Sequence, residues 1–406
     1  MLAALISLCL VPVVARIFEP EHFGVAAVFL AIIATLGPLS TACFDMAIVL
    51  TKSESEASKL VKFSALVLIV FAVFVFMFLA VVYLWGVNVP LLEEIGVFSW
   101  LIPVVILLFG IINILENWLT RKKAYSSIAG SDVIQAAVMP VTRIGLGLYY
   151  GSSVTVLIFG YLIGTFSKIA LIMKSILSNK ELIIKNEKIE ISKLIYEYRD
   201  FPLYSTPSRF LRSLSKSLPV LMMSYMFSPA IAGFYAMADR LVSMPTDSVA
   251  ASVRRVYIQK ASEYNNKNIS LEKIFIKITL ALFFIGVIPF GILWTNGEEI
   301  VGFILGDRWL YAGHFSEILA PWFFSIWLVT PSSALFVIYR KQKLWLNIQI
   351  LLSFMRMGVF FLAYLMNLSS DQTLYGFVAI SVLVNIGVVY IVYRLVLTNH
   401  SMRVNA

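Results

Sequence analysis

The sequence predicts an all-α, polytopic membrane protein of about twelve transmembrane helices in two six-helix lobes. Three observations carry this prediction: the composition, a series of long apolar spans, and a motif that recurs half a chain later. Of the 406 residues, 60% are hydrophobic and 14% are charged, whereas a soluble domain has about 25% charged residues. The chain is therefore expected in a bilayer, and its net charge of +9 does not call for a nucleic-acid partner.

Each apolar span is close to or above the roughly 20 residues that a membrane-spanning helix needs. Residues 1–18 lack the basic start and the small-residue cleavage site of a signal peptide, so we expect a retained helix there. Cys9 and Cys43 both fall within spans and predict no disulfide or metal motif. The expected spans are 1–18, 22–50, 60–86, 91–119, 128–150, 153–178, 203–227, 230–257, 271–296, 316–339, 343–366 and 372–397.

The distribution of positive charge predicts the topology. With Met1 in the cytoplasm, 22 of the 32 lysine and arginine residues lie in inner segments and only Arg16 and Arg308 lie in outer segments. This bias is the one that the positive-inside rule describes. We therefore expect both termini in the cytoplasm.

A motif repeat divides the chain into halves. The pattern Phe-x-Pro-x-x-x-Gly-x-x-Ala occurs at Phe18–Ala27 and again at Phe227–Ala236, 209 residues later. Both copies run in the same sense, so the repeat is parallel, and a binding site is expected between the halves near the midplane. The predicted domains are an N-terminal lobe at 1–178, a cytoplasmic linker with an amphipathic helix at 179–200, and a C-terminal lobe at 201–406.

A cationic stripe marks the first span of the second half. Arg209, Arg212 and Lys216 have the spacing i, i+3, i+7, which places them on one face of a helix. A cation at the bilayer centre costs roughly 2.5–3.5 kcal/mol, and such residues usually face a polar interior. The stripe therefore predicts a water-filled cavity for an anion, although Arg209 and Arg212 near the span end could instead snorkel to the surface.

Other ionisable side chains fall inside spans and extend this prediction. Asp239 could instead have a structural role, as the ion-pair partner of the stripe. The carboxylates that lie at span ends could instead be solvated among the lipid headgroups; they are Asp45, Glu116 and Asp132. We assign Asp239 and Asp247 to charge pairing or ion coupling. The expected substrate-binding cations are Arg209, Arg212, Lys216, Arg240, Arg356, Arg143 and Lys168.

No motif of enzyme chemistry is present, so we expect no catalytic residues and no cofactor. His22, His314 and His400 are too scattered in sequence to predict a metal site. The pair Glu298-Glu299 is interpreted as solvated charge. It opens an amphipathic outer loop, residues 297–316, with Trp309 as an interfacial anchor.

Four stretches of the sequence resemble the polysaccharide exporters. They are ARIFEPEHFGVAAVFLAI at 15–32, RDFPLYSTPSRFLRSLSKSLPVLMMSYMFSPAIAGFYAMADRLVSMP at 199–245, LGDRWLYAGHFSEILAPWF at 305–323, and Arg340-Lys341. These stretches are similar to the Wzx-type O-antigen flippases of the multidrug/oligosaccharidyl-lipid/polysaccharide (MOP) superfamily. The resemblance implies a MATE-like transporter fold and a place in the cytoplasmic (inner) membrane of a bacterium. It also implies a polyprenyl-diphosphate-linked oligosaccharide, such as a lipopolysaccharide repeat unit, as cargo.

Two alternatives stay open at this point. A drug or organic-cation antiporter should have an anionic cavity, whereas the deep charges here are mostly basic. A membrane-embedded glycan polymerase or ligase should have a large outer loop, and none here exceeds roughly 20 residues. For the flippase, the expected partners are the lipid-linked oligosaccharide, membrane lipids and glycan polymerase machinery.

The topology is open to a direct test. A cysteine placed in the Arg121–Lys123 segment should not react with an impermeant thiol reagent in intact cells, whereas one placed at Glu299 should react. The reason is the charge asymmetry across the bilayer. Labelling from outside at Arg121–Lys123 would contradict the predicted orientation.

Overall fold

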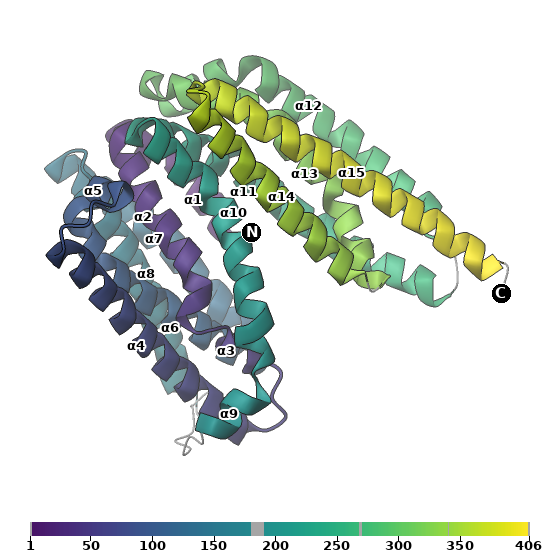
Figure 1. The fold of residues 1–406 in the computed structure, drawn as a ribbon, viewed down its shortest axis with the longest axis horizontal. Helices are drawn as coiled ribbons and strands as arrows, with labels where there is room; N and C mark the ends of the chain where they lie inside the picture. The colour runs from purple at the N-terminus through teal and green to yellow at the C-terminus, as the bar shows by residue number, and fades with distance from the viewer. Residues whose placement is uncertain (1, 180–190, 268–269, 340, 405–406) are drawn as a thin grey trace. The chain divides into compact units, whose positions relative to one another are not determined.

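The computed structural model describes residues 2–179, 191–267, 270–339 and 341–404, and within these ranges every regular element is helical (Figure 1). This confirms the predicted all-α class. Helices of 16 residues or more match the predicted spans one for one and in order. They are α1 (Leu2–Ile17), α2 (Pro20–Ser40), α4 (Glu54–Leu84), α6 (Ile102–Arg121), α7 (Tyr125–Tyr150), α8 (Val154–Ser178), α10 (Thr206–Met226), α11 (Pro229–Asn266), α12 (Glu272–Leu305), α13 (Leu310–Ile338), α14 (Gln342–Leu365) and α15 (Ser370–Val404).

Among the described residues, eight helical segments are long and apolar enough to cross a bilayer, and α1 is a shorter apolar helix. The helices α7, α10 and α11 are not among the eight. They are the more polar helices, and they carry most of the cations that the sequence places in the site. The protein is therefore a multi-pass membrane protein, and α7, α10 and α11 hold five of the seven cations predicted for the site.

The predicted span at 22–50 is divided in two. The helix α2 ends at Ser40, and Ala42 and Cys43 have φ angles of 46° and 57° before the short helix α3 (Phe44–Ala47). A left-handed backbone cannot continue a right-handed helix. The predicted end of the span at residue 50 is wrong because residues 41–50 are apolar for another reason. Most of their side chains are buried inside the protein, in a turn that does not continue the helix.

The prediction of a loop at 297–316 is wrong, because most of this segment is helical. The helix α12 bends at Asn296, which has φ −136° and ψ 23°, and then continues to Leu305. A short 3₁₀ helix, η4 (Asp307–Trp309), leads directly into α13. Trp309 is not an interfacial anchor either, because its side chain is fully buried and its ring packs edge-on against Phe234.

The chain forms two compact units, residues 1–233 and residues 234–406. In the first unit α7 packs along α8, α1 along α7, and α10 along α2 (Figure 1). In the second unit α12 packs on α13, and α15 contacts both α13 and α14. The unit boundary follows the packing of α10, whereas the lobes at 1–178 and 201–406 follow the sequence repeat and stay a prediction.

Part of the expected amphipathic linker, residues 180–190, lies outside the described residues. The described part holds a short helix, α9 (Ile191–Glu197), and a π-helical turn, η3 (Phe201–Ser205), that leads into α10. Between them, the Tyr198 hydroxyl donates a hydrogen bond to Glu56 of α4. Burial and the Glu56 carboxylate together raise the pKa of Tyr198.

The two copies of the repeated motif meet within the first unit. A Cβ atom on Gly24 would lie 1.7 Å from the carbonyl oxygen of Pro229, and one on Gly233 would lie 2.0 Å from the carbonyl oxygen of Pro20. The contact is reciprocal, since each glycine faces the proline that opens the other copy. The two copies therefore sit at the same end of the helices, as a parallel repeat requires.

Substitution at this contact should destabilise the protein. Gly24→Ala should lower the free energy of unfolding by about 1–3 kcal/mol or more, because the added methyl group overlaps backbone atoms that cannot rotate away. Gly130→Ala in α7 is the matched control, because its Cβ would have no heavy atom within 4 Å. The measurement is the thermal midpoint in detergent. Equal midpoints for the two variants would contradict the close contact.

Candidate functional site

The predicted cationic stripe is exposed on α10. Arg209, Arg212 and Lys216 are all exposed, while Ser217, Leu218 and other residues of the opposite side are buried. The helix is anchored on its buried side, where it packs along α2. Its amphipathic character thus comes from one buried apolar face and one cationic face.

One stripe residue has a defined protein contact. The Arg209 Nη1 atom lies 2.8 Å from the Sδ atom of Met46. A thioether is a weak acceptor, so this contact leaves most of the hydrogen-bonding capacity of the guanidinium available. Further along α10, the Ser213 hydroxyl donates a hydrogen bond to the Ala34 carbonyl of α2 and helps to fix the helix.

Arg143 lies inside the α7–α8 pair. Its Nε and Nη2 atoms donate hydrogen bonds of 3.1 Å and 2.9 Å to the Leu157 carbonyl. Gly160 makes room for it, since a Cβ there would lie 2.4 Å from Arg143 Cγ. The Arg143 side chain therefore joins α7 to α8, and its role in substrate binding stays a prediction.

Lys168 lies between two carboxylates. Its Nζ atom is 2.5 Å from Glu116 of α6 and 2.6 Å from Asp132 of α7, and the Lys168 side chain is only 9% exposed. Asp45 is also bonded, since it accepts a 2.9 Å hydrogen bond from Asn117 Nδ2. The alternative for these carboxylates was solvation among lipid headgroups. In the structure they are partners in a polar network that links helices of the first unit.

The second unit contains a cavity of about 740 Å³ that gathers three arginines. Arg254 and Arg255 come from α11 and Arg356 comes from α14, while Asp247 is the one carboxylate among the lining residues. Aromatic side chains Trp322 and Trp345 and the amides of Gln349 and Asn385 complete its polar and stacking surface. A cavity with this charge balance favours an anion.

Arg356 is held in place by aromatic rings. Its guanidinium carbon lies 5.1 Å from the Trp322 ring centre and 4.8 Å from that of Phe377. Its Nε atom also donates a 3.0 Å hydrogen bond to Ser381. Cation–π contacts and one fixed hydrogen bond orient the planar group while its remaining N–H donors can face the cavity.

Sequence reasoning missed Arg254 and Arg255. They were counted with the positive charges of an inner segment, although they lie near the end of the predicted span 230–257. The helix α11 contains both and continues to Asn266. A usable signal was present, since Asp247 and Arg254 are seven residues apart and so share a helical face. Both arginines line the cavity wall from this helix.

The other predicted residues of α11 lie nearer the start of the helix. Asp239 and Arg240 are both partly exposed. Asp247 lines the arginine cavity, and a coupling role for Asp239 or Asp247 stays a prediction.

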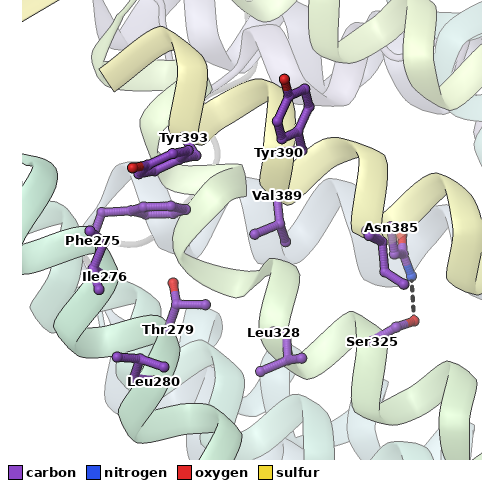
Figure 2. Close-up of a pocket in the computed structure, with 11 residues that line it drawn as sticks. Phe275, Ile276, Thr279, Leu280, Ser325, Leu328, Asn385, Val389, Tyr390 and Tyr393 are labelled. Carbon is purple, nitrogen blue, oxygen red and sulfur yellow. Dashed lines mark hydrogen bonds between the residues drawn. The ribbon is translucent and has the colours of Figure 1, made fainter. Parts of the chain in front are cut away.

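A second, apolar pocket of about 410 Å³ lies beside α12, α13 and α15. Figure 2 shows Phe275, Tyr390 and Tyr393 around it, with Asn385 hydrogen-bonded to Ser325. The Asn385 Nδ2–Ser325 Oγ distance is 2.8 Å. Asn385 lines both pockets, so the apolar pocket and the arginine cavity are neighbours.

The fold matches transporters of one class. The chain is similar to an inward-facing multidrug resistance MATE family transporter of the MOP superfamily, with a TM-score of 0.75, 13% identity, and coverage of 98% of this chain and 94% of that one. It is also similar to the lipid II flippase MurJ in an inward closed conformation, with a TM-score of 0.76, 12% identity, and coverage of 98% and 89%. A MOP superfamily transporter from Pyrococcus furiosus has a TM-score of 0.61, 14% identity, and coverage of 98% and 92%.

These likenesses define a polytopic helical protein with the MOP fold, as the resemblance implied. A family model described as "Polysaccharide biosynthesis protein" matches residues 13–313. The chain therefore belongs to this family, and the resemblance to the polysaccharide exporters is confirmed. Comparison with curated protein sequences gives no match.

The Lys168 network predicts a structural effect that can be separated from transport. Lys168→Ala should lower the free energy of unfolding by about 1–3 kcal/mol, because it leaves Glu116 and Asp132 without their shared cation. Adding Glu116→Gln should recover part of that loss by removing one unpaired charge. The measurement is the thermal midpoint of the purified variants, and a Lys168→Ala midpoint equal to that of the wild type would exclude the structural role.

Proposed function

We propose that the protein is a flippase that moves a polyprenyl-diphosphate-linked oligosaccharide across the cytoplasmic membrane by alternating access. The observation that carries the proposal is the arginine cavity of the second unit, with three guanidinium groups and one carboxylate on its wall. Membership of a polysaccharide-biosynthesis family and the MOP fold support the same class of cargo. The cargo is an O-antigen or another surface-polysaccharide repeat unit.

The chemistry of the cavity suits a diphosphate. An arginine presents a planar fork of N–H donors that can bind two phosphate oxygens at once. Arg356 is pre-oriented by Trp322 and Phe377, so its donors lose little freedom when an anion binds. Trp322 and Trp345 line the same wall and can contact apolar faces of sugar rings, so the cavity offers groups that suit both a glycan and its diphosphate.

The neighbouring apolar pocket suits the lipid part of such a cargo. Its wall is built from aliphatic and aromatic side chains, and it meets the arginine cavity at Asn385. An amphiphile with a diphosphate head and an isoprenoid chain likewise has an anionic group next to an apolar one, so it matches the order of the two pockets. In the proposed complex, the head binds Arg254, Arg255 and Arg356 and the first isoprene units enter the apolar pocket.

The remaining predicted cations belong to the proposed path of the cargo. Arg209, Arg212 and Lys216 present an exposed cationic face on α10, which can contact the diphosphate during its movement. Arg240 of α11 is a further cation proposed to contact the cargo. Arg143 and Lys168 have the protein partners described above, and any contact with the cargo requires exchange of those partners. Asp239 and Asp247 are proposed to couple transport to an ion.

The charge of the cavity distinguishes this proposal from an organic-cation antiporter. A cation carrier needs carboxylates at its site to replace hydration of the cargo. The arginine cavity has three arginines against Asp247, which disfavours a cationic cargo by like-charge repulsion. The same balance favours a lipid-linked anion.

Neutralising the arginines should weaken cargo binding and export. Arg254→Ala or Arg356→Ala should each weaken binding of a polyprenyl diphosphate by roughly 10- to 150-fold, because a charge-assisted hydrogen bond contributes about 1.5–3 kcal/mol. Arg212→Ala and Lys216→Ala should reduce export, and Arg212→Glu should abolish it. Arg212→Lys should be impaired despite its charge, since lysine lacks the fork. The measurements are binding to the purified protein and complementation of glycan export at matched membrane abundance.

Matched controls come from the same elements. Lys260→Ala removes an exposed cation of α11 outside the arginine cavity, and Lys52→Ala removes one from the segment before α4. Both should bind and export normally. If Arg254→Ala and Arg356→Ala bind the diphosphate as the wild type does, the cavity is not its site. If the α10 variants also export normally, the flippase mechanism proposed here fails.

A further inference from the structure

The second unit holds a histidine-centred group of potential ligands that the sequence did not predict. Glu298 lies just after the bend of α12, His314 and Glu317 lie on the first turns of α13, and Asp371 lies at the start of α15. One ligating atom from each of Glu298, His314 and Glu317 lies within 4.8 Å of the others. We propose that these three side chains bind a divalent transition-metal ion of the Zn²⁺ type.

The distances fit a small tetrahedral ion. His314 Nδ1 is 3.1 Å from Glu298 Oε1 and 3.9 Å from Glu317 Oε2. Bonds of about 2.0–2.2 Å to nitrogen and oxygen around Zn²⁺ separate neighbouring ligand atoms by roughly 3.3 Å. A shift of the Glu317 carboxylate by a few tenths of an ångström therefore completes three ligands. Glu298 is half-exposed, which leaves the fourth position open to water.

The hydrogen bonding around the histidine supports a metal rather than a bare ion pair. His314 Nε2 is 3.4 Å from the Asp371 carboxylate, which in turn accepts a 2.6 Å hydrogen bond from the Tyr311 hydroxyl. A carboxylate on the far nitrogen of a ligating histidine is the usual outer contact of a metal site, and it sets the tautomer. A proton on Nε2 would leave the Nδ1 lone pair facing Glu298 and Glu317, which is the arrangement that a metal ligand requires.

A lone pair that faces two carboxylates needs a cation. A proton on Nδ1 can bond to Glu298 at 3.1 Å, but Glu317 Oε2 at 3.9 Å is beyond hydrogen-bond distance. A divalent ion satisfies all three atoms and offsets more of the negative charge of the three carboxylates. The presence of an imidazole nitrogen favours Zn²⁺ over Mg²⁺, which prefers oxygen ligands.

The backbone holds the ligands in place before any ion binds. A Cβ on Gly313 would lie 2.5 Å from Glu298 Cα, and one on Gly297 would lie 2.8 Å from the Gly313 carbonyl oxygen. This close approach brings the residues that follow the two glycines, Glu298 and His314, together. The Glu298 backbone N–H also donates a 3.0 Å hydrogen bond to Glu317 Oε1, which leaves Oε2 for a ligand. A bound ion would thus clamp the bend of α12 to α13.

The test is zinc binding by the full-length protein in detergent. Competition with a chromophoric chelator should give one Zn²⁺ per chain. His314→Ala should weaken that binding by more than about 100-fold, and Asp371→Asn should weaken it by roughly 10- to 100-fold through the loss of outer orientation. Zn²⁺ should also raise the thermal midpoint of the wild type, and Mg²⁺ at the same concentration should not.

Two controls separate this site from adventitious binding and from misfolding. His22→Ala removes a partly exposed histidine that bonds to Ser152, and Cys9→Ser removes an exposed thiol. Neither should change the affinity for zinc. Glu317→Gln keeps the acceptor for the Glu298 N–H but loses the charged ligand, so it should fold as the wild type does in a chelator and bind zinc more weakly.

Three outcomes would overturn the proposal. The first is a wild type that binds no zinc, and the second is a wild type whose affinity equals that of His314→Ala. The third is a thermal midpoint that depends on pH through His314 but is the same with zinc and with chelator, which would identify a protonated imidazole bridging the carboxylates. All three are measured on binding and stability, so they leave the proposed transport function untouched.

Discussion

The structure depends on one constraint, which is that a charged group inside an apolar helix bundle needs a partner or a polar cavity. Lys168 meets it with two carboxylates, and Arg143 meets it with the Leu157 carbonyl. Arg356 meets it with two aromatic rings and a serine at the edge of a cavity. The cost of an unpaired charge in a low-dielectric interior explains why each of these residues is so closely surrounded.

Charges in buried ion pairs and charges gathered on a cavity wall have different roles. The Lys168 network joins α6, α7 and α8, so it supports the shape of the first unit. The arginine cavity instead collects three cations, and Asp247 is the only carboxylate among the described residues of its wall. Excess charge of one sign on a cavity wall is costly for folding and is therefore a sign of a ligand of the other sign. That contrast within one chain is the physical basis for proposing an anionic cargo.

Close backbone contacts at glycine residues determine the positions of neighbouring segments and of the charged side chains on them. Gly24 and Gly233 bring the two copies of the repeated motif together, and Gly297 and Gly313 do the same for the bend of α12 and the start of α13. Without a side chain, two backbones can approach to a distance that any larger residue forbids. The first contact organises the repeat, and the second assembles the ligand group around His314.

The sequence by itself determined the fold class, the number and order of the long helices, the parallel repeat and the basic character of the polar helices. Apolar length, charge asymmetry and motif spacing are local or periodic properties, and they act before any tertiary contact forms. It also placed Arg356 and Asp247, two residues of the arginine cavity, among the candidate residues. Its boundaries failed at Ala42–Cys43, where a buried apolar turn resembles a membrane span in composition. They failed also at 297–316, where a charged part of a bent helix resembles a loop.

Only the tertiary structure decided which charges meet. The partners of Lys168 are 36 and 52 residues away in sequence, and the contacts of His314 come from three different helices. No periodic pattern encodes such distances, since they depend on how the helices pack. Arg254 and Arg255 of α11 line one cavity with Arg356 of α14, although about 100 residues separate them in the sequence. The residue types fix what chemistry is available, and the packing of the helices fixes which groups can act together.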